Sequence, residues 1–259
     1  MGGELAGRVA LVTGGGSGIG RAIALRFAEQ GASVVVCGRR KEPLDEVVAA
    51  TAEIVPDNPA VAVPADASRE DDVDRLFAEI ADRFGRLDVL VNNAGVPGAI
   101  GQLWEVSLEG WEETLGVNLT GPWLCSRAAA RMMLPRRSGR IVNIGSVTGK
   151  RPLAGRGAYA ASKLGLVALT RALALELGPH GITANNISPA GVDTERLAQL
   201  ADAAGEPVDD LKGRWAGVAA TGRISTPEDV AEAALFLASD RASNVNGVDL
   251  NVDGGLAFA

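Results

Sequence analysis

The feature that most constrains this fold is the alternation of short, β-branched apolar segments with longer helical patterns along the whole chain. Parallel strands need long crossover connections, usually helices, so this alternation predicts βαβ units and a parallel sheet. Several strand candidates are apolar on both faces, which favours strands covered by helices on each side. The seven expected strands are 8–13, 33–37, 60–64, 87–91, 140–145, 183–187 and 248–252.

Helical patterns fill most of the intervals between these strands. Ser68 is expected to cap one helix, and Thr226-Pro227-Glu228-Asp229 supplies a cap, a first-turn proline and acids at the positive helix end. The stretch 191–224 has no strand character and is too long for an ordinary connection, so we expect a substrate lid there. The expected helices are 18–30, 43–55, 69–84, 108–134, 157–177 and 227–238.

Composition narrows the function classes. The 259 residues are 47% hydrophobic, include 33 glycines and carry a net charge of −7, which gives no basic footprint for nucleic acid. Cys37 and Cys125 lie in apolar contexts, so we expect two buried thiols and neither a disulfide nor a metal site. No purely apolar run approaches the ~18 residues of a membrane helix, and we expect a cytoplasmic protein with no membrane partner.

A glycine-rich loop, TGGGSGIG at residues 13–20, runs from the first strand directly into a helical pattern. Glycines let the backbone turn tightly and approach a pyrophosphate, whose charge is met by free N–H groups and the positive end of the helix dipole. A glycine loop alone is weak evidence for such a site, because an ordinary turn is the alternative. The flanking strand and helix favour a dinucleotide site.

The end of the second strand bears on cofactor choice. An acid there binds the ribose hydroxyls of NAD, whereas an arginine accommodates the 2′-phosphate of NADP. This chain has Gly38 followed by Arg39, which offers a planar fork to a phosphate. The alternative is that Arg39 and Arg40 belong to a solvated turn. We expect NADP(H) to be favoured over NAD(H).

Tyr159 is the only tyrosine of the chain, and Lys163 follows four residues later in a helical pattern. Positions i and i+4 share a helix face, so the phenol and the ammonium can act on one site. A phenol is a weak base at neutral pH, and a nearby positive charge stabilises its phenolate. The alternative is an ordinary amphipathic helix whose lysine extends to water.

These features together resemble the short-chain dehydrogenase/reductase family over essentially the whole chain. Five separated motifs occur in the family's order, and Ser146 precedes Tyr159 by thirteen residues, the spacing this family shows. The motifs are TGGGSGIG at 13–20, NNAG at 92–95, Asn118 within VNLTG, Ser146 within IVNIGSVTG, and YAASK at 159–163.

The resemblance implies roles for these residues. Ser146 would hydrogen-bond the reacting oxygen, Tyr159 would transfer the proton, and Lys163 would hold the nicotinamide ribose. Asn118 would kink its helix and anchor a water in a proton relay to Lys163, and Asp66 would contact the adenine amino group. The full expected cofactor set is Thr13, Gly14, Ser17, Gly18, Ile19, Gly20, Gly38, Arg39, Asp66, Ala67, Asn93, Ala94, Gly95, Tyr159, Lys163, Pro189, Val192 and Thr194.

Two positions depart from the family pattern. Ala190 replaces the usual glycine after the sixth strand, and alanine disfavours a left-handed backbone, which leaves the path of that loop open. Ser17 stands in the glycine loop where NADP-preferring members often have a basic residue, which weakens the expected NADP preference. The only histidine, His180, is expected at a surface turn with no catalytic role.

The sequence therefore predicts an α/β fold: one Rossmann-type domain over 1–259, with a doubly wound parallel sheet of seven strands in the order 3-2-1-4-5-6-7. We expect an NAD(P)(H)-dependent reductase or dehydrogenase acting on a carbonyl or alcohol carbon of a small molecule, assembled as a homotetramer. Two alternatives are a catalytically silent cofactor-binding regulator or scaffold, and a sugar-nucleotide epimerase or dehydratase. The sequence names neither the substrate nor the direction of reaction.

Overall fold

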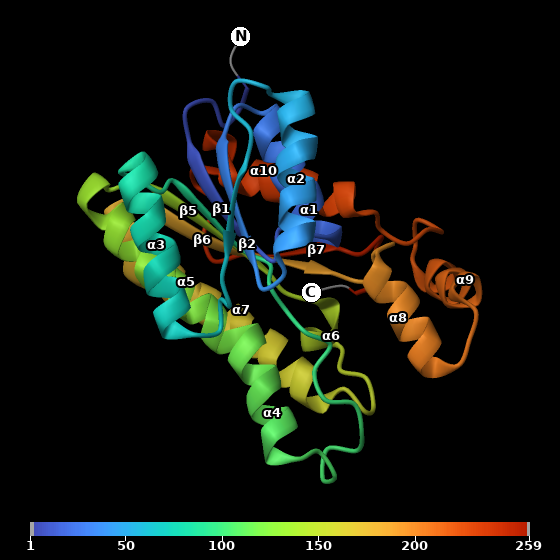
Figure 1. Ribbon diagram of the computed structural model, residues 1–259. Helices are drawn as coiled ribbons and strands as arrows, with labels where there is room; N and C mark the ends of the chain where they lie inside the picture. The colour runs from blue at the N-terminus through green and yellow to red at the C-terminus, as the bar shows by residue number, and fades with distance from the viewer. Residues whose placement is uncertain (1–2, 258–259) are drawn as a thin grey trace.

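Seven parallel strands form one sheet in the order β3-β2-β1-β4-β5-β6-β7 in the computed structural model, which describes residues 3–257 (Figure 1). The predicted strand number, order and direction are confirmed. The strands are β1 (Val9–Thr13), β2 (Ser33–Gly38), β3 (Val61–Pro64), β4 (Val89–Asn92), β5 (Gly139–Ile144), β6 (Ile182–Pro189) and β7 (Asp249–Val252).

Helices cover both faces of the sheet because successive strand residues point to opposite faces. In β1, Ala10 and Val12 pack with α1, α2 and α10, whereas Val9 and Leu11 pack with α3, α5 and α7. The helices are α1 (Gly18–Glu29), α2 (Lys41–Ile54), α3 (Glu70–Phe84), α4 (Leu108–Leu115), α5 (Gly121–Met133), α6 (Val147–Lys150), α7 (Gly157–Leu177), α8 (Glu195–Ala204), α9 (Val208–Val218) and α10 (Pro227–Ala238), with short η2 (Leu134–Arg136), η3 (Gly178–His180) and η4 (Asp240–Ala242).

The single helix predicted over 108–134 is wrong in one respect. A π-helical turn, η1 (Gly116–Thr120), separates α4 from α5, with the fully buried Asn118 at its centre. The spacing of apolar residues predicts which face of a helix is buried. It does not predict a single π-helical turn within that helix. Such turns are frequent at functional sites.

The two helix starts singled out in the sequence behave differently. Thr226 is the N-cap of α10, as expected, and Pro227 occupies the first turn; Thr226 also forms a capping box with Asp229. The N-cap of α3 is Arg69 and not Ser68, so that expectation is wrong. Ser68 instead donates its N–H and its hydroxyl to Asp66 Oδ1, at 3.0 and 2.6 Å, because a short polar side chain readily closes a local turn.

The stretch 191–224 forms two helices, α8 and α9, which pack on each other through their own apolar cluster around Leu197, Ala201 and Leu211. Ala190 does not adopt the left-handed backbone that alanine disfavours, since Arg137 is the one non-glycine with positive φ in the part of the chain described. The glycine requirement falls on Gly191, where an added Cβ would overlap the ring of Trp215.

Helix α7, with the turn after it, is long and apolar enough by composition to cross a membrane. Its residues Leu166 and Ala174 are buried, and the helix packs against β6. Figure 1 shows α7 running along one face of the sheet, as expected of a core helix.

Candidate active site

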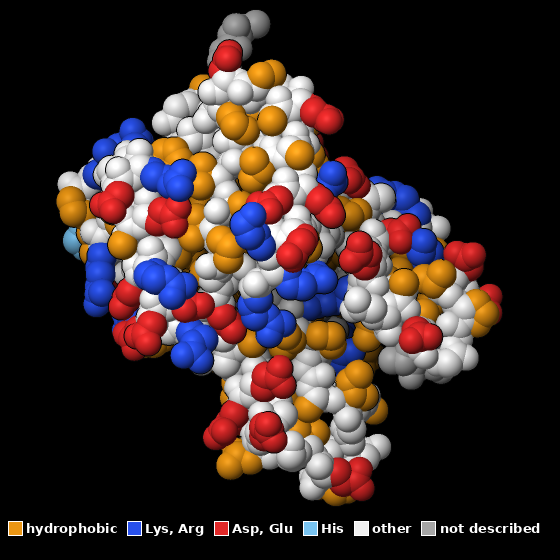
Figure 2. All heavy atoms as spheres, viewed as in Figure 1, with side chains coloured by type: hydrophobic (Ala, Val, Ile, Leu, Met, Phe, Trp, Pro, Cys, Tyr) orange, Lys and Arg blue, Asp and Glu red, His pale blue; other side chains and the backbone are white. Residues whose placement is uncertain are grey.

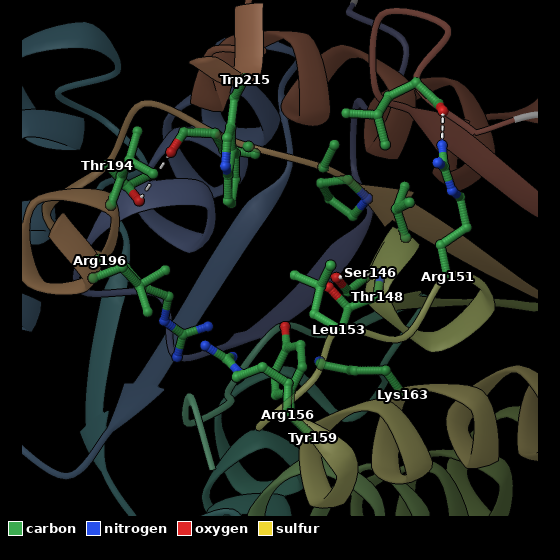
Figure 3. A pocket seen from close by; sticks show the side chains of 18 of the residues that line it. Ser146, Thr148, Arg151, Leu153, Arg156, Tyr159, Lys163, Thr194, Arg196 and Trp215 are labelled. Atoms are coloured by element: carbon green, nitrogen blue, oxygen red, sulfur yellow. Dashed lines mark hydrogen bonds between the residues drawn. The ribbon is translucent and has the colours of Figure 1, made fainter. Parts of the chain in front are cut away.

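A cavity of about 640 Å³ opens at the carboxyl ends of β5 and β6, between α7 and the helices α8 and α9. Ligands of open parallel sheets bind at this edge. Figure 3 shows the side chains of Ser146, Tyr159 and Lys163 converging on it from one side, with Thr194, Arg196 and Trp215 opposite.

Tyr159 and Lys163 lie one turn apart on α7, as their spacing predicted. The Nζ atom of Lys163 lies 5.8 Å from the centre of the Tyr159 ring and donates to the carbonyl oxygen of Ile144 at 2.8 Å. Lys163 is only 4% exposed, so the alternative of a lysine reaching to water is wrong. Burial, with a smaller contribution from the charge of Arg196, lowers the pKa of Lys163 to about 7.

Ser146 follows the end of β5 and is the N-cap of α6. Its hydroxyl oxygen accepts from the Thr148 N–H at 3.1 Å, which fixes the side chain at the cavity wall while leaving its own proton to donate. The central sheet thus holds one side of the site and α7 the other.

Asn118 faces the loop after β4 from the π turn. Its Oδ1 accepts from the Val96 N–H at 2.8 Å, and its Nδ2 donates to the Val96 carbonyl and to Ser162 Oγ at 3.1 and 3.2 Å. Ser162 Oγ in turn donates to the Tyr159 carbonyl oxygen at 2.7 Å. The Asn118 side chain therefore links this loop to the backbone of the tyrosine.

The glycine loop is braced by the residues that follow β4. Asn93 Nδ2 donates to the carbonyl oxygens of Thr13 and Gly14 at 3.0 Å, and the Ala94 N–H donates to Thr13 Oγ1 at 3.1 Å. An added Cβ on Gly20 would overlap the Gly14 carbonyl and Asn93 Nδ2. Glycine is therefore required at position 20 because the backbone there packs directly against Gly14 and Asn93.

The first turn of α1 fits a dinucleotide phosphate. Ser17 is the N-cap but makes no side-chain capping bond, which leaves the first N–H groups of the helix open to an anion. A pocket of about 240 Å³ beside it is lined by Gly14, Gly16, Ser17, Gly38, Arg39, Arg40, Pro43 and Leu44.

The predicted cofactor residues divide into three groups. Those lining the larger cavity are Ile19, Asn93, Tyr159, Lys163, Pro189, Val192 and Thr194, whereas Gly14, Ser17, Gly38 and Arg39 line the smaller pocket. The remaining predicted residues line neither the larger cavity nor the smaller pocket: Thr13, Gly18, Gly20, Asp66, Ala67, Ala94 and Gly95. Asp66 accepts from Ser68, and Thr194 Cγ2 lies 3.3 Å from where a Gly18 Cβ would stand.

Four arginines of the site were not predicted from the sequence. Arg151, Arg156, Arg196 and Arg214 line the larger cavity. The Arg156 Cζ lies 4.7 Å from the centre of the Tyr159 ring. Of these arginines, only Arg156 could have been predicted from its spacing. It precedes Tyr159 by three positions, and residues three apart lie on the same side of a helix. His180 lies in η3 and does not line this cavity, in agreement with its predicted surface position.

No metal site accompanies this arrangement within residues 3–257, where no three His, Cys, Asp or Glu side chains gather in a way that could hold an ion. Cys37 and Cys125 are buried free thiols, as expected, and burial raises the pKa of Cys37 to about 12.

Comparisons with known proteins agree with the fold and show the family. A family model described as enoyl-(acyl carrier protein) reductase matches residues 14–257. A short-chain dehydrogenase/reductase of Armillaria gallica is 40% identical over 97% of both chains, and a cis-4-hydroxycyclohexanecarboxylate dehydrogenase of Sinomonas cyclohexanicum is 41% identical over 98% of both. The crystal structure of a levodione reductase superposes with a TM-score of 0.93 at 33% identity over 98% of both chains. This chain belongs to the short-chain dehydrogenase/reductase family and is an NAD(P)-dependent oxidoreductase acting between carbonyl and alcohol carbons.

Proposed function

We propose that Tyr159, Ser146, Lys163 and Asn118 carry this hydride-transfer chemistry at the larger cavity. The convergence of the buried Tyr159 and Lys163 with Ser146 on one wall is the observation that carries the proposal. A bound nicotinamide supplies or accepts the hydride, and the protein supplies orientation and proton transfer. Neither of the two alternatives, a catalytically silent regulator or scaffold and a sugar-nucleotide epimerase or dehydratase, finds support in the comparisons. The relatives bear the names of dehydrogenases and reductases, and the chain covers nearly their full length.

Hydride addition to a carbonyl carbon leaves negative charge on its oxygen, which positioned donors must stabilise. Ser146 donates a hydrogen bond to that oxygen, and the Tyr159 hydroxyl delivers the proton. In alcohol oxidation, Tyr159 removes the same proton. Lys163 holds positive charge beside the phenol and binds the ribose hydroxyls, while Asn118 keeps the loop after β4 and the Tyr159 backbone in place and anchors a water on the way to Lys163.

A carbonyl panel tests this proposal. Purified protein is mixed with NADPH or NADH and with ketones of different size and charge, and the reverse reaction is run with the corresponding alcohols. We expect oxidation of reduced cofactor with at least one small ketone. Absence of turnover in both directions across the panel would contradict the proposal.

We further propose that NADPH is preferred over NADH. The smaller pocket is lined by Arg39 and Arg40, with no carboxylate among its described lining residues. Neither arginine forms an ion pair within residues 3–257, so both can turn toward a 2′-phosphate. Comparing kcat/KM for the two cofactors on one good substrate tests the preference.

The stretch 191–224 is proposed as the substrate lid. Its helices form a separate apolar cluster outside the two main cores, and its Thr194 lies over the glycine loop. Closing such a segment excludes water from the reacting atoms. Amide hydrogen exchange of 191–224 should slow in the complex with cofactor and a substrate analogue, and equal exchange in the free and bound protein would contradict a lid.

A cytoplasmic homotetramer is proposed as the working form. Large apolar side chains remain exposed on and near α4 and α7, including Trp104 at 81%, Leu108 at 70% and Leu175 at 79%. Figure 2 shows hydrophobic side chains exposed among acidic ones in the projecting region around α4. Apolar surface of this kind is typical of an interface between subunits. Light scattering that reports a monomer at micromolar concentration would exclude the tetramer.

A further inference from the structure

The larger cavity is positively charged although the whole chain carries a net charge of −7. Its lining contains five basic side chains: Arg151, Arg156, Lys163, Arg196 and Arg214. The one acidic side chain among the described lining residues is Glu206, and both of its oxygens already accept from Arg214 at 2.7 Å. Lys and Arg side chains gather along the hollow beside α8 and α9 (Figure 2). Such a cavity favours an anion.

Arg156 and Arg196 approach each other from opposite sides of the site, one beside Tyr159 and one from α8 (Figure 3). Each donates to the backbone of the same loop after β4. Arg156 Nη2 donates to the Pro97 carbonyl oxygen at 3.0 Å, and Arg196 Nη2 donates to the Gly95 carbonyl oxygen. These two bonds hold both guanidinium groups at the loop after β4, and that of Arg156 also lies over the Tyr159 ring.

Most donors of the two guanidinium groups are left unused. A guanidinium carries five N–H donors, and neither Arg156 nor Arg196 forms an ion pair within residues 3–257. The Arg156 Nε is buried without a hydrogen-bond partner. Burial lowers the pKa of Arg156; the interaction with Tyr159 opposes this shift, and the charge of Arg196 adds a smaller lowering, in keeping with two like charges held close together. A bound anion would satisfy the unused donors and relieve this repulsion.

We propose that Arg156 and Arg196 bind a carboxylate of the substrate beside Tyr159, so that the enzyme acts on small oxo or hydroxy acids. This inference rests on the hydride transfer proposed above. Two guanidinium groups offer the paired, directional donors that a carboxylate accepts. The cofactor diphosphate has its own site at the open N–H groups of α1, which leaves these arginines for the substrate.

The size of the cavity limits the acid. A volume of about 640 Å³ must take the nicotinamide end of the cofactor as well, since Ile19, Val192 and Thr194 are part of its lining. The substrate is therefore small. Leu153, Leu197 and Trp215 supply the apolar surface for its carbon skeleton.

Two ketones of equal shape and different charge test the proposal. The probes are 4-oxocyclohexanecarboxylate and its neutral amide, 4-oxocyclohexanecarboxamide, each assayed with NADPH and NADH. We expect kcat/KM to be at least about tenfold higher for the acid, mainly through KM, as for a charge-assisted hydrogen bond. Equal values for the acid and the amide would overturn the inference while leaving hydride transfer standing.

Three variants locate the effect. Arg156→Met and Arg196→Met should each lower the acid-to-amide ratio at least about fivefold, whereas Arg156→Lys should retain more of it because the charge remains. Arg131→Met, an exposed arginine on α5 outside the cavity, is the matched control and should keep the ratio. An unchanged ratio in both Met variants overturns the inference. Weaker NADPH binding by Arg196→Met with an unchanged ratio would assign Arg196 to the cofactor and overturn the paired site.

A binding measurement separates this inference from the proposed reaction. Cyclohexanecarboxylate and cyclohexanecarboxamide have no carbonyl at the reacting position, and calorimetry with saturating NADP⁺ reports their affinity without turnover. Tighter binding of the carboxylate, lost in Arg156→Met, supports the anion site even if neither ketone is reduced. Failure of the carboxylate to bind more tightly than the amide overturns it.

Discussion

The floor and the roof of the larger cavity are built differently. The floor, formed by the end of β5 and by α7, holds Tyr159 and Lys163 at 9% and 4% exposure and is continuous with the core of the sheet. The roof, formed by α8 and α9, has three buried apolar side chains of its own. Chemistry thus rests on a rigid support, whereas substrate selection rests on a small unit that can open at low cost.

The largest expected effect is on the floor. Lys163→Met removes the titratable amine beside Tyr159 and its hydrogen bond to Ile144, so turnover should fall at least about a hundredfold. Steady-state kinetics with saturating cofactor measures the loss. A Lys163→Met enzyme with more than about a tenth of the wild-type kcat would show that the buried ammonium is not needed.

The same variant should change the pH dependence of stability. Because the pKa of Lys163 is about 7 in the folded protein and 10.5 for an ordinary lysine, the unfolded chain binds a proton that the folded chain lacks between these values. The free energy of unfolding of the wild type should therefore rise as pH increases through this window. Lys163→Met lacks this contribution.

Urea unfolding of both proteins without cofactor, at pH 7 and pH 8.5 and one protein concentration, isolates that difference. The buried thiols act in the opposite direction at higher pH, since their raised pKa keeps them protonated in the folded state, but they contribute equally to both proteins. Parallel pH profiles of the two proteins would contradict a depressed pKa of Lys163.

The next effect concerns the roof. Gly191→Ala places a methyl group on the ring of Trp215, and displacing α9 should lower kcat/KM about tenfold, in line with the usual cost of overpacking. Trp215→Ala makes room for that methyl. The double variant should therefore lose less than the two single losses added together, and strict additivity would show that Gly191 and Trp215 are not coupled.

Cofactor choice should respond to a single residue beside the glycine loop. An added Cβ at Gly38 meets only Leu44 Cδ2, at 3.7 Å, so the backbone at this position has room for the first carbon of an aspartate. Its carboxylate accepts from the NAD ribose hydroxyls and repels a 2′-phosphate, which should reverse a preference for NADPH of about tenfold. The ratio of kcat/KM for NADPH and NADH, measured at two ionic strengths, tests this; a wild-type enzyme that favours NADH would refute the role of Arg39.

The smallest effect lies far from the site. Thr226→Ala removes the side-chain half of the capping box of α10 and should cost about 1 kcal/mol of unfolding free energy, with kcat unchanged. A loss of turnover comparable to that of a roof variant would mean that α10 is coupled to the lid.

Floor and roof also differ in how far the sequence predicted them. Glycine spacing, β-branched strands and the Tyr159–Lys163 pair follow local rules, and the sheet order and the position of these residues agree with the structure. The apolar repeat alone did not indicate the π turn at Asn118, where only the family resemblance implied a kink, because the bonds that support this turn, to Val96 and Ser162, come from residues distant in sequence.

The roof arginines were missed for a related reason. Arg196 becomes a site residue only because α8 places it opposite Arg156. Nothing in the sequence around Arg196 predicts that juxtaposition of distant segments. Two apolar residues of the lid, Leu197 and Leu211, line the cavity and also pack in the apolar cluster of α8 and α9.

The most direct test of the account is Tyr159→Phe, which deletes one hydroxyl and keeps the ring. Calorimetry should show unchanged folding and NADPH affinity, while kcat on the best ketone of the panel should fall at least about a hundredfold, because only the proton donor is lost. A Tyr159→Phe enzyme that keeps more than about a tenth of the wild-type kcat would contradict the assigned mechanism.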